Sequence, residues 1–321
     1  MSDPTFVVST AYTPPVSHAR TETSDRTPIR IGLVQHQWLP DSEALRAALL
    51  DGIGLAAAEG ARAVFLPELT LSRYPADIRA GENPGATAED LTTGPTFAFA
   101  AAAARRHGVA VHASLYERAT GTDGLGFNTA ILVSPAGELI GRTRKLHIPI
   151  SDGYYEDTYF RPGPADDAYP VYRPAELDGA AIGMPTCWDQ WFPEVARIYS
   201  LGGAEILVYP TAIGSEPSFP DFDTQPLWQH VIVGNGITAG TFMVVPNRFG
   251  DEGSVRFYGS SFISDPYGRV LVQAPRDRAA VLVADLDLDQ RRDWLGLFPF
   301  PATRRPDTYG RLTAALESET A

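Results

Sequence analysis

The feature that most constrains the fold of this 321-residue chain is a helix-to-strand unit that recurs along it. The segment EGARAVFLPEL (59–69) resembles GGAEILVYPTA (202–212), because in both a helix ends at glycine and an apolar strand follows that ends at proline. Glycine tolerates the left-handed conformation that ends a helix. Two looser copies lie at 97–117 and 234–248. Four such units predict a sheet system with internal pseudo-symmetry and with helices on its outside.

Other strands and helices fit between these units. Residues 31–35 predict a short apolar strand, and residues 42–59 predict a helix rich in Ala and Leu. One hairpin is predicted at 128–149, around Pro-Ala-Gly, and another at 258–275, around Asp-Pro-Tyr-Gly. Residues 279–288 add a further strand. Mixed α and β elements without a linker between them indicate a single domain.

The two ends of the chain differ in composition from its middle. Residues 1–28 are rich in Ser, Thr and Pro without clear periodicity, and we expect a flexible N-terminal extension that is mobile or loosely docked. The single domain then spans 29–321. From about Arg291 onward, arginine, proline and aromatic residues predict an extended C-terminal arm. Packing on its own surface and crossing to a neighbouring subunit both remain open for this arm.

Charge and cysteine usage restrict the partners and the compartment. The 26 basic and 39 acidic residues give a net charge of −13, which argues against nucleic acid or an anionic membrane as the natural partner. A cationic substrate is compatible with this charge, as is a plain solvated acidic surface. A single cysteine cannot form an intrachain disulfide, which fits a reducing compartment. We see no targeting segment and no run of about 18 apolar residues, and therefore expect a cytoplasmic protein.

The single cysteine, Cys187, lies in a tight connection. It follows the apolar stretch 180–184 and precedes a helix that starts at Pro193. Such a position exposes a side chain at a sheet edge and brings backbone N–H groups close to it. A thiolate is a strong nucleophile when a base or a lowered pKa activates it. A buried, inert cysteine is the alternative that the residue alone leaves open.

Three further charged residues occupy positions suited to catalysis. Glu68 ends an apolar strand, where α/β proteins place working carboxylates. Lys145 ends the second strand of the first hairpin, from which an ammonium group could stabilise an oxyanion. Glu156 lies among tyrosines, including Tyr154 and Tyr155, so it is a candidate for a perturbed pKa. Taken one at a time, each of the three could equally be a solvated surface residue.

Taken together, these segments resemble the carbon–nitrogen hydrolase (nitrilase) superfamily, which has a Glu–Lys–Cys catalytic set. The resemblance runs from about Ile29 to the C-terminal region, and the three residue types occur in the family's order. The motifs that carry it are FLPEL, RKLHIP, GYYEDTYFRPG and TCWDQWFPE. Within the superfamily, CWDQWFPE, YPTAIGSEP, FYGSSFISDPYGRV and RRPDTYGRL are most similar to the N-carbamoylputrescine amidohydrolase group.

The resemblance implies a fold and a mechanism. The implied fold is a nitrilase-like α-β-β-α sandwich, and the implied assembly is a homodimer or a higher homo-oligomer. Glu68 would act as the base, Cys187 as the nucleophile, and Lys145 with the backbone N–H of Trp188 would hold the oxyanion. Glu156 would position Lys145 and the substrate. The implied partner is a small amide or carbamoyl compound, and no metal or organic cofactor enters this scheme.

An N-carbamoyl amine such as N-carbamoylputrescine is the expected substrate. An ammonium tail is recognised by carboxylates and aromatic faces. The candidates for these contacts are Tyr74, Tyr154, Trp188, Asp152 and Glu216.

Two alternative functions remain open. Hydrolysis of an N-carbamoyl amino acid or an ω-amide would favour an arginine in the pocket, for which Arg73 and Arg248 are candidates. A non-catalytic scaffold is disfavoured because all four catalytic residue types are present. The segment Met184-Pro185-Thr186 stands where the family usually has an aliphatic stretch, and it puts the substrate in question rather than the chemistry.

Overall fold

The first of two large sheets contains seven strands. A computed structural model describes residues 6–121 and 123–314. Across the sheet, the strands are β1 (Val7–Ala11), β15 (Ala280–Leu286), β2 (Ile29–Gln35), β3 (Ala63–Phe65), β4 (Ala110–Glu117), β5 (Phe127–Val133) and β6 (Leu139–Arg144). The central strands β2, β3 and β4 are parallel, whereas β15 is antiparallel to β2 and β5 is antiparallel to β4.

The second sheet repeats this arrangement. Across it, the strands are β14 (Val270–Gln273), β13 (Phe262–Ser264), β10 (Phe242–Val245), β9 (Ile206–Val208), β8 (Ile182–Gly183) and β7 (Val171–Tyr172). Its central strands β8, β9 and β10 are again parallel, with an antiparallel strand on either side. A separate hairpin pairs β11 (Phe249–Glu252) with β12 (Val255–Tyr258). The predicted pseudo-symmetry is therefore confirmed for six strands of each sheet, and β1 has no counterpart in the second sheet.

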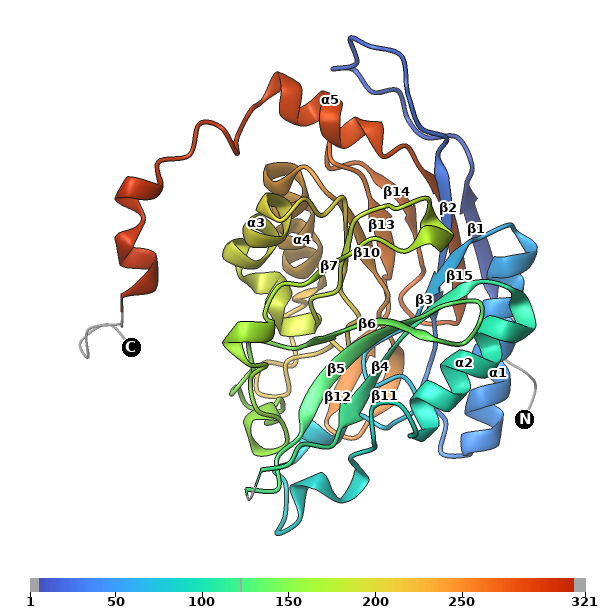
Figure 1. The fold of residues 1–321 in the computed structure, drawn as a ribbon. Helices are drawn as coiled ribbons and strands as arrows, with labels where there is room; N and C mark the ends of the chain where they lie inside the picture. The colour runs from blue at the N-terminus through green and yellow to red at the C-terminus, as the bar shows by residue number, and fades with distance from the viewer. Residues whose placement is uncertain (1–5, 122, 315–321) are drawn as a thin grey trace.

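Helices cover the outer face of each sheet (Figure 1). The helices are α1 (Ser42–Ala58), α2 (Pro95–His107), α3 (Pro193–Leu201), α4 (Gln225–Ala239) and α5 (Asp289–Leu297). Short 3₁₀ turns complete the described structure at Pro75–Asp77, Pro84–Thr87, Glu156–Thr158, Ala165–Asp167, Ala175–Leu177, Cys187–Trp191, Pro306–Thr308 and Gly310–Thr313. Helices α1 and α2 pack on the first sheet, and α3 and α4 pack on the second. The predicted α-β-β-α sandwich is confirmed.

The glycine signals in the repeated unit have the expected physical role. Each of the helices α1 to α4 is followed by a glycine in the left-handed region. The φ angles are +86° at Gly60, +67° at Gly108, +87° at Gly203 and +66° at Gly240. A side chain with a Cβ atom is disfavoured in this conformation, so glycine allows the chain to leave the helix and enter the next strand.

The main core lies between the two sheets. Inward-facing side chains of both sheets meet there, among them Leu33 of β2, Ile182 of β8 and Val244 of β10. Neighbouring residues on the same strands face the helices instead, as Val34 does, because side chains alternate across a strand. Two sheets held by one shared core place the ends of β3, β6, β8 and β9 in fixed relation to one another.

The N-terminal extension is ordered rather than loosely docked, which corrects the expectation for residues 1–28 over its described part. Strand β1 pairs in parallel with β15 along its whole length. Further along, the guanidinium of Arg20 donates hydrogen bonds to Asp287 and Asp293, both at 2.7 Å. Residues 1–5 lie outside the described part of the chain.

The C-terminal arm starts later than expected. Arg291 is part of α5 and donates hydrogen bonds to the carbonyl oxygens of Ser200 (2.9 Å) and Ala239 (2.8 Å), so it belongs to the packed body. Beyond Leu297, the described residues run away from that body (Figure 1). Contact of this arm with a neighbouring subunit stays a prediction. Among the described residues, no helix combines the length and apolar character needed to cross a membrane.

Candidate active site

The four residues singled out in the sequence converge in the structure, three of them after the ends of strands from both sheets and Glu156 in the 3₁₀ turn Glu156–Thr158. Glu68 follows β3, Lys145 directly follows β6, and Cys187 follows β8. All are buried: the side chains of Glu68 and Lys145 are fully enclosed, and the residues Glu156 and Cys187 are 1% and 5% exposed. Working groups of α/β proteins gather at the carboxyl ends of parallel strands, and β3 and β8 supply that edge here.

Lys145 lies between two carboxylates. Its Nζ is 3.0 Å from Oε1 of Glu68 and 2.7 Å from Oε2 of Glu156. Burial opposes the charge of Lys145, but the two carboxylates outweigh it and raise the pKa of the ammonium group. Burial raises the pKa of Glu156 to about 7, with Lys145 lowering it and Glu68 raising it. The site therefore holds a fixed ammonium ion in a dry environment, where it interacts strongly with a developing negative charge.

Further donors fix the two carboxylates. Glu68 accepts hydrogen bonds from Nδ2 of Asn128 (2.7 Å) and from the backbone N–H of Ala212 (2.8 Å). Glu156 accepts one from the hydroxyl of Tyr74 (3.0 Å). Tyr74 was expected to contact substrate, but it is fully buried and supports Glu156 instead. Asn128 was not predicted from the sequence, where its signal is a polar residue near the start of the apolar strand β5.

A second sequence signal, which concerns Lys145, was also missed in the prediction. Lys145 is the only lysine of the chain, and the other 25 basic residues are all arginine. Lysine is a compact point charge, whereas the guanidinium of arginine is a planar fork. The ammonium group fits between Glu68 and Glu156, at 3.0 and 2.7 Å from their oxygens, which explains why lysine rather than arginine occupies this position.

Cys187 has a strained backbone. Its φ is +40°, in the left-handed region that side chains with Cβ avoid, and its N–H donates to the carbonyl of Pro210 (3.0 Å). Such strain concentrates at functional sites. Burial and then Glu68 raise the pKa of the thiol well above its usual value, while Lys145 and a backbone hydrogen bond from Ala212 lower it. The resting thiol keeps its proton at neutral pH and needs a base to become a nucleophile.

A cavity of about 310 Å³ opens onto Cys187. Its lining consists of Pro149, Ser151, Tyr154, Glu156, Cys187, Trp188, Trp191, Ala212, Ile213, Glu216, Thr224 and Leu227. Glu68 and Lys145 lie directly behind this wall, bonded to Ala212 and Glu156. Of the predicted substrate contacts, Tyr154, Trp188 and Glu216 line the cavity. Asp152 does not, because its carboxylate is exposed and bonds to Tyr155 and Ser218.

Neither arginine considered for a carboxylate-bearing substrate reaches this cavity. Arg248 is fully buried, pairs with Glu252 (2.7 Å) and donates to the carbonyl oxygens of Glu68 (2.7 Å) and Leu69 (2.9 Å). It therefore holds the chain segment that carries Glu68. Arg73 forms two hydrogen bonds with Asp77 instead, at 2.6 and 2.8 Å.

The unusual segment Met184–Thr186 also lies away from the substrate space. All three residues are buried, and none of them lines the cavity. Met184 packs in the core between the sheets. The segment Met184–Thr186 therefore supports the backbone that leads to Cys187 and does not form part of the pocket wall.

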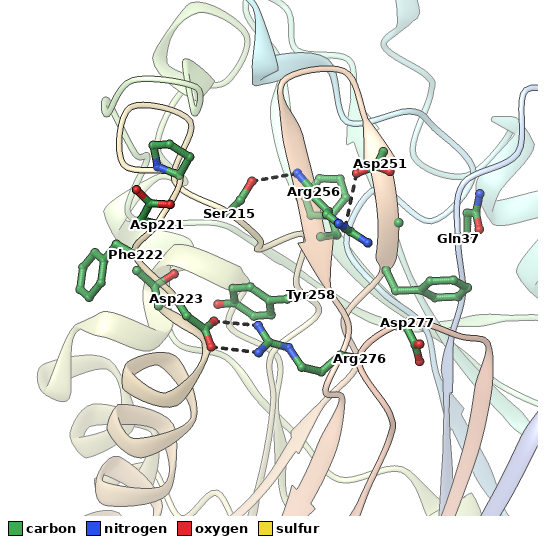
Figure 2. Close-up of a pocket in the computed structure, with 15 residues that line it drawn as sticks. Gln37, Ser215, Asp221, Phe222, Asp223, Asp251, Arg256, Tyr258, Arg276 and Asp277 are labelled. Carbon is green, nitrogen blue, oxygen red and sulfur yellow. Dashed lines mark hydrogen bonds and ion pairs between the residues drawn. The ribbon is translucent and has the colours of Figure 1, made fainter.

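A second, larger cavity has a volume of about 630 Å³, and Figure 2 shows residues that line it. Both cavities share Thr224 as a lining residue. This larger cavity, called the outer cavity below, is lined by exposed charged side chains. Among them, Arg276 donates to both oxygens of Asp223 at 2.7 and 2.9 Å. None of the four candidate residues lines it, so the chemistry belongs to the smaller cavity. Among the described residues, no cluster of three or more His, Cys, Asp and Glu could hold a metal ion.

Comparison with known proteins gives matches over most of the chain. The family model described as carbon–nitrogen hydrolase matches residues 30–295. The chain is 35% identical to a citrullinase of Francisella tularensis over 88% of this chain and 98% of that protein. It is 37% identical to an N-carbamoylputrescine amidase of Arabidopsis thaliana, over 78% and 84%. The crystal structure of a carbon–nitrogen hydrolase from Helicobacter pylori is similar, with a TM-score of 0.78, 29% identity, and coverage of 90% and 100%.

Proposed function

The chain belongs to the carbon–nitrogen hydrolase family, and we propose that this enzyme hydrolyses an N-carbamoyl amine through a thioester on Cys187. One observation carries the proposal: the ammonium group of Lys145 is held between two buried carboxylates directly behind the cavity that contains Cys187. This arrangement joins a nucleophile, a base and a fixed positive charge in one dry site, as attack on an amide-type carbonyl requires.

The reaction begins with proton transfer from the Cys187 thiol to Glu68. The thiolate attacks the carbonyl carbon of the carbamoyl group, and the negative charge moves to the carbonyl oxygen. Lys145 and the backbone N–H of Trp188 stabilise this oxyanion. When the tetrahedral intermediate collapses, Glu68 gives its proton to the departing ammonia or amine, which leaves a carbamoyl thioester on Cys187.

Water completes the cycle. Glu68 takes a proton from a water molecule, which attacks the thioester carbonyl, and the sulfur leaves as the thiol of Cys187. The released carbamic acid breaks down to carbon dioxide and the remaining amine or ammonia. Glu156 keeps Lys145 in place through the 2.7 Å contact and is itself held by Tyr74.

The lining of the cavity supports a substrate with a cationic tail. Glu216 is half-buried, burial raises its pKa, and the Thr224 hydroxyl donates to it at 3.2 Å. Aromatic faces are supplied by Tyr154, Trp188 and Trp191, and cations bind favourably over such faces. Among the described residues that line the cavity, none is arginine or lysine. This composition favours an N-carbamoyl diamine such as N-carbamoylputrescine.

The second candidate is a ureido amino acid such as citrulline, or a related N-carbamoyl amino acid or ω-amide. The similarity to a citrullinase over 98% of that protein favours it. A free α-carboxylate normally requires an arginine or another strong donor, and Arg73 and Arg248 are engaged elsewhere. Ammonia release from N-carbamoylputrescine, citrulline and N-carbamoyl-β-alanine, with Cys187→Ser as the blank, tests the two. Turnover of only the carboxylate-bearing compounds would contradict the diamine proposal.

Substitution of Glu216 tests tail recognition directly. Glu216→Gln is expected to raise KM for N-carbamoylputrescine about 10- to 100-fold, since a charge-assisted hydrogen bond contributes about 1.5–3 kcal/mol. KM for N-butylurea, which has the same chain without the ammonium group, should stay unchanged. Asp277→Asn, in the outer cavity, is the matched control and should alter neither value. Equal effects of Glu216→Gln on KM for both substrates would show that Glu216 does not recognise the positive charge of the substrate tail.

A further inference from the structure

We propose that Asp189 is a positioning residue that fixes Cys187 relative to Lys145, an inference that rests on the roles proposed above for those two residues. Asp189 lies two positions after Cys187 in the turn Cys187–Trp191 and is only 1% exposed. Its carboxylate contacts the residues that flank both partners, although it touches neither the thiol nor the ammonium group.

Between them, the two oxygens of Asp189 contact two different segments of the chain. Oδ2 accepts a hydrogen bond from the backbone N–H of Thr186 (3.1 Å), directly before Cys187, and a longer one from Leu146 (3.4 Å). Oδ1 accepts from the backbone N–H of His147 at 2.9 Å and contacts its Nδ1 at 2.7 Å. One carboxylate therefore ties the Cys187 turn to the segment that follows Lys145.

This link crosses from one sheet to the other. Lys145 continues β6 at the edge of the first sheet, whereas Cys187 follows β8 of the second. The reaction needs the thiol and the ammonium group to meet one carbonyl group at the same time. A displacement of about 1 Å between such groups can cost about 100-fold in rate, so a rigid link between the segments has a direct catalytic value.

The chemistry of the link requires a carboxylate rather than an amide. An ionised aspartate only accepts hydrogen bonds, and both of its oxygens face N–H donors. Asparagine has the same shape, but its NH₂ group would face a donor on one side whichever way the amide is turned. Asp189→Asn therefore keeps the turn filled while breaking the contact either with Thr186 or with His147.

A substitution at His147 tests the same link with a smaller change to it. Its ring stacks on Phe192, with 3.7 Å between the ring centres and 14° between the planes, and Nδ1 meets Asp189. His147→Ala removes this one side-chain contact and leaves the backbone donors of Thr186 and His147 in place. A smaller effect than that of Asp189→Asn is expected.

The experiment compares Asp189→Asn with Asp265→Asn. Asp265 is also fully buried and accepts hydrogen bonds from the backbone N–H groups of Tyr267 and Arg269, but it lies in the β13–β14 hairpin and lines neither cavity. For each variant, kcat, KM, the thermal midpoint and the rate of alkylation by iodoacetamide are measured. Since Cys187 is the only cysteine, alkylation reports on its environment without any substrate.

Asp189→Asn is expected to lower kcat about 100-fold with little change in KM, and to slow alkylation, because the thiol loses its alignment with Glu68 and Lys145. Asp265→Asn should lower only the thermal midpoint. Unchanged kcat and alkylation in Asp189→Asn, with a similar loss of thermal midpoint, would overturn the inference and leave Asp189 as a structural cap. If Asp189→Asn does not fold, His147→Ala decides: a several-fold lower kcat supports the inference, and a wild-type kcat overturns it.

Failure of this inference is distinguishable from failure of the proposed function. If the wild-type enzyme releases no ammonia from any carbamoyl compound, the proposed substrate class is wrong. The alkylation rates of the two variants still compare Asp189 with Asp265 in that case, because they require only the thiol and its neighbours.

Discussion

Replacing Glu68 with glutamine is expected to lower kcat by about 10²- to 10⁴-fold, the contribution of a positioned general base. The thiol of Cys187 has a raised pKa, so it needs a group that removes its proton. Glutamine has nearly the same shape and can still accept from either Asn128 or Ala212, but it cannot take up a proton from the thiol. Glutamine also weakens the buried pairing with Lys145, so some stability is lost, but the loss of kcat should persist at temperatures well below the thermal midpoint.

Steady-state ammonia release and the thermal midpoint measure these two effects separately. Glu89→Gln is the matched control, because Glu89 accepts hydrogen bonds from the N–H and hydroxyl of Thr96 at the start of α2 and does not line the cavity of Cys187. Its kcat should be that of the wild type. If Glu68→Gln loses no more activity than Glu89→Gln, another group must act as the base.

Replacing Lys145 with methionine is expected to impair both folding and catalysis. Without the ammonium group, Glu68 and Glu156 are two buried carboxylates without their shared cation. Removing one partner of a buried ion pair costs about 3–5 kcal/mol of stability. The loss of an oxyanion donor lowers kcat by about 10²- to 10³-fold. Lys145→Arg keeps the charge, yet its planar group differs in shape from the ammonium group that fits between the carboxylates.

The stability loss in Lys145→Met should depend on pH. The pKa of Glu156 is about 7 in the folded enzyme against an ordinary value of 4.5, and loss of the ammonium group raises it further. Above pH 4.5 the folded variant therefore binds more protons than the unfolded chain, so its stability falls as the pH rises towards and beyond 7. Urea unfolding at several pH values measures this.

The double variant Lys145→Met/Glu156→Gln provides the control for this effect. It removes one of the two carboxylates, so it should recover part of the stability lost by Lys145→Met. A pH-independent loss that persists in the double variant would contradict the electrostatic explanation.

The sequence predicted the two sheets well because their signals are local. The glycine that ends a helix and the apolar strand that follows it are both encoded by residues adjacent in the sequence, as at Gly60 and Gly203. Strand β1 gives no such signal. Val7–Ala11 lies among Ser, Thr and Pro, and it becomes a strand only because β15, far along the chain, offers an unpaired edge. Pairing of this kind depends on tertiary structure rather than local propensity.

The candidate site likewise combines residues that local motifs predict with contacts that form only in the folded structure. Glu68, Lys145, Glu156 and Cys187 were found through motifs, and the structure brings all four together. The supporting contacts could not be read from spacing, since Asn128 approaches Glu68 only after β5 has paired in the sheet.

Arg248 was a candidate contact only for the alternative, carboxylate-bearing substrate, and a reason for its structural role is visible along the chain. Arg248 and Glu252 are four positions apart and form a buried ion pair, so the arginine is satisfied before any ligand arrives. A nearby acidic partner is thus a sign that an arginine has a structural role.

The most direct test of the account is the covalent intermediate on Cys187. The enzyme is mixed with N-carbamoylputrescine, quenched with acid during turnover, and digested for mass spectrometry. A carbamoyl-derived adduct on the single cysteine-containing peptide is expected in the wild type, and Cys187→Ser should show neither adduct nor ammonia release. Turnover without an adduct, together with ammonia release by Cys187→Ser, would contradict the thioester mechanism.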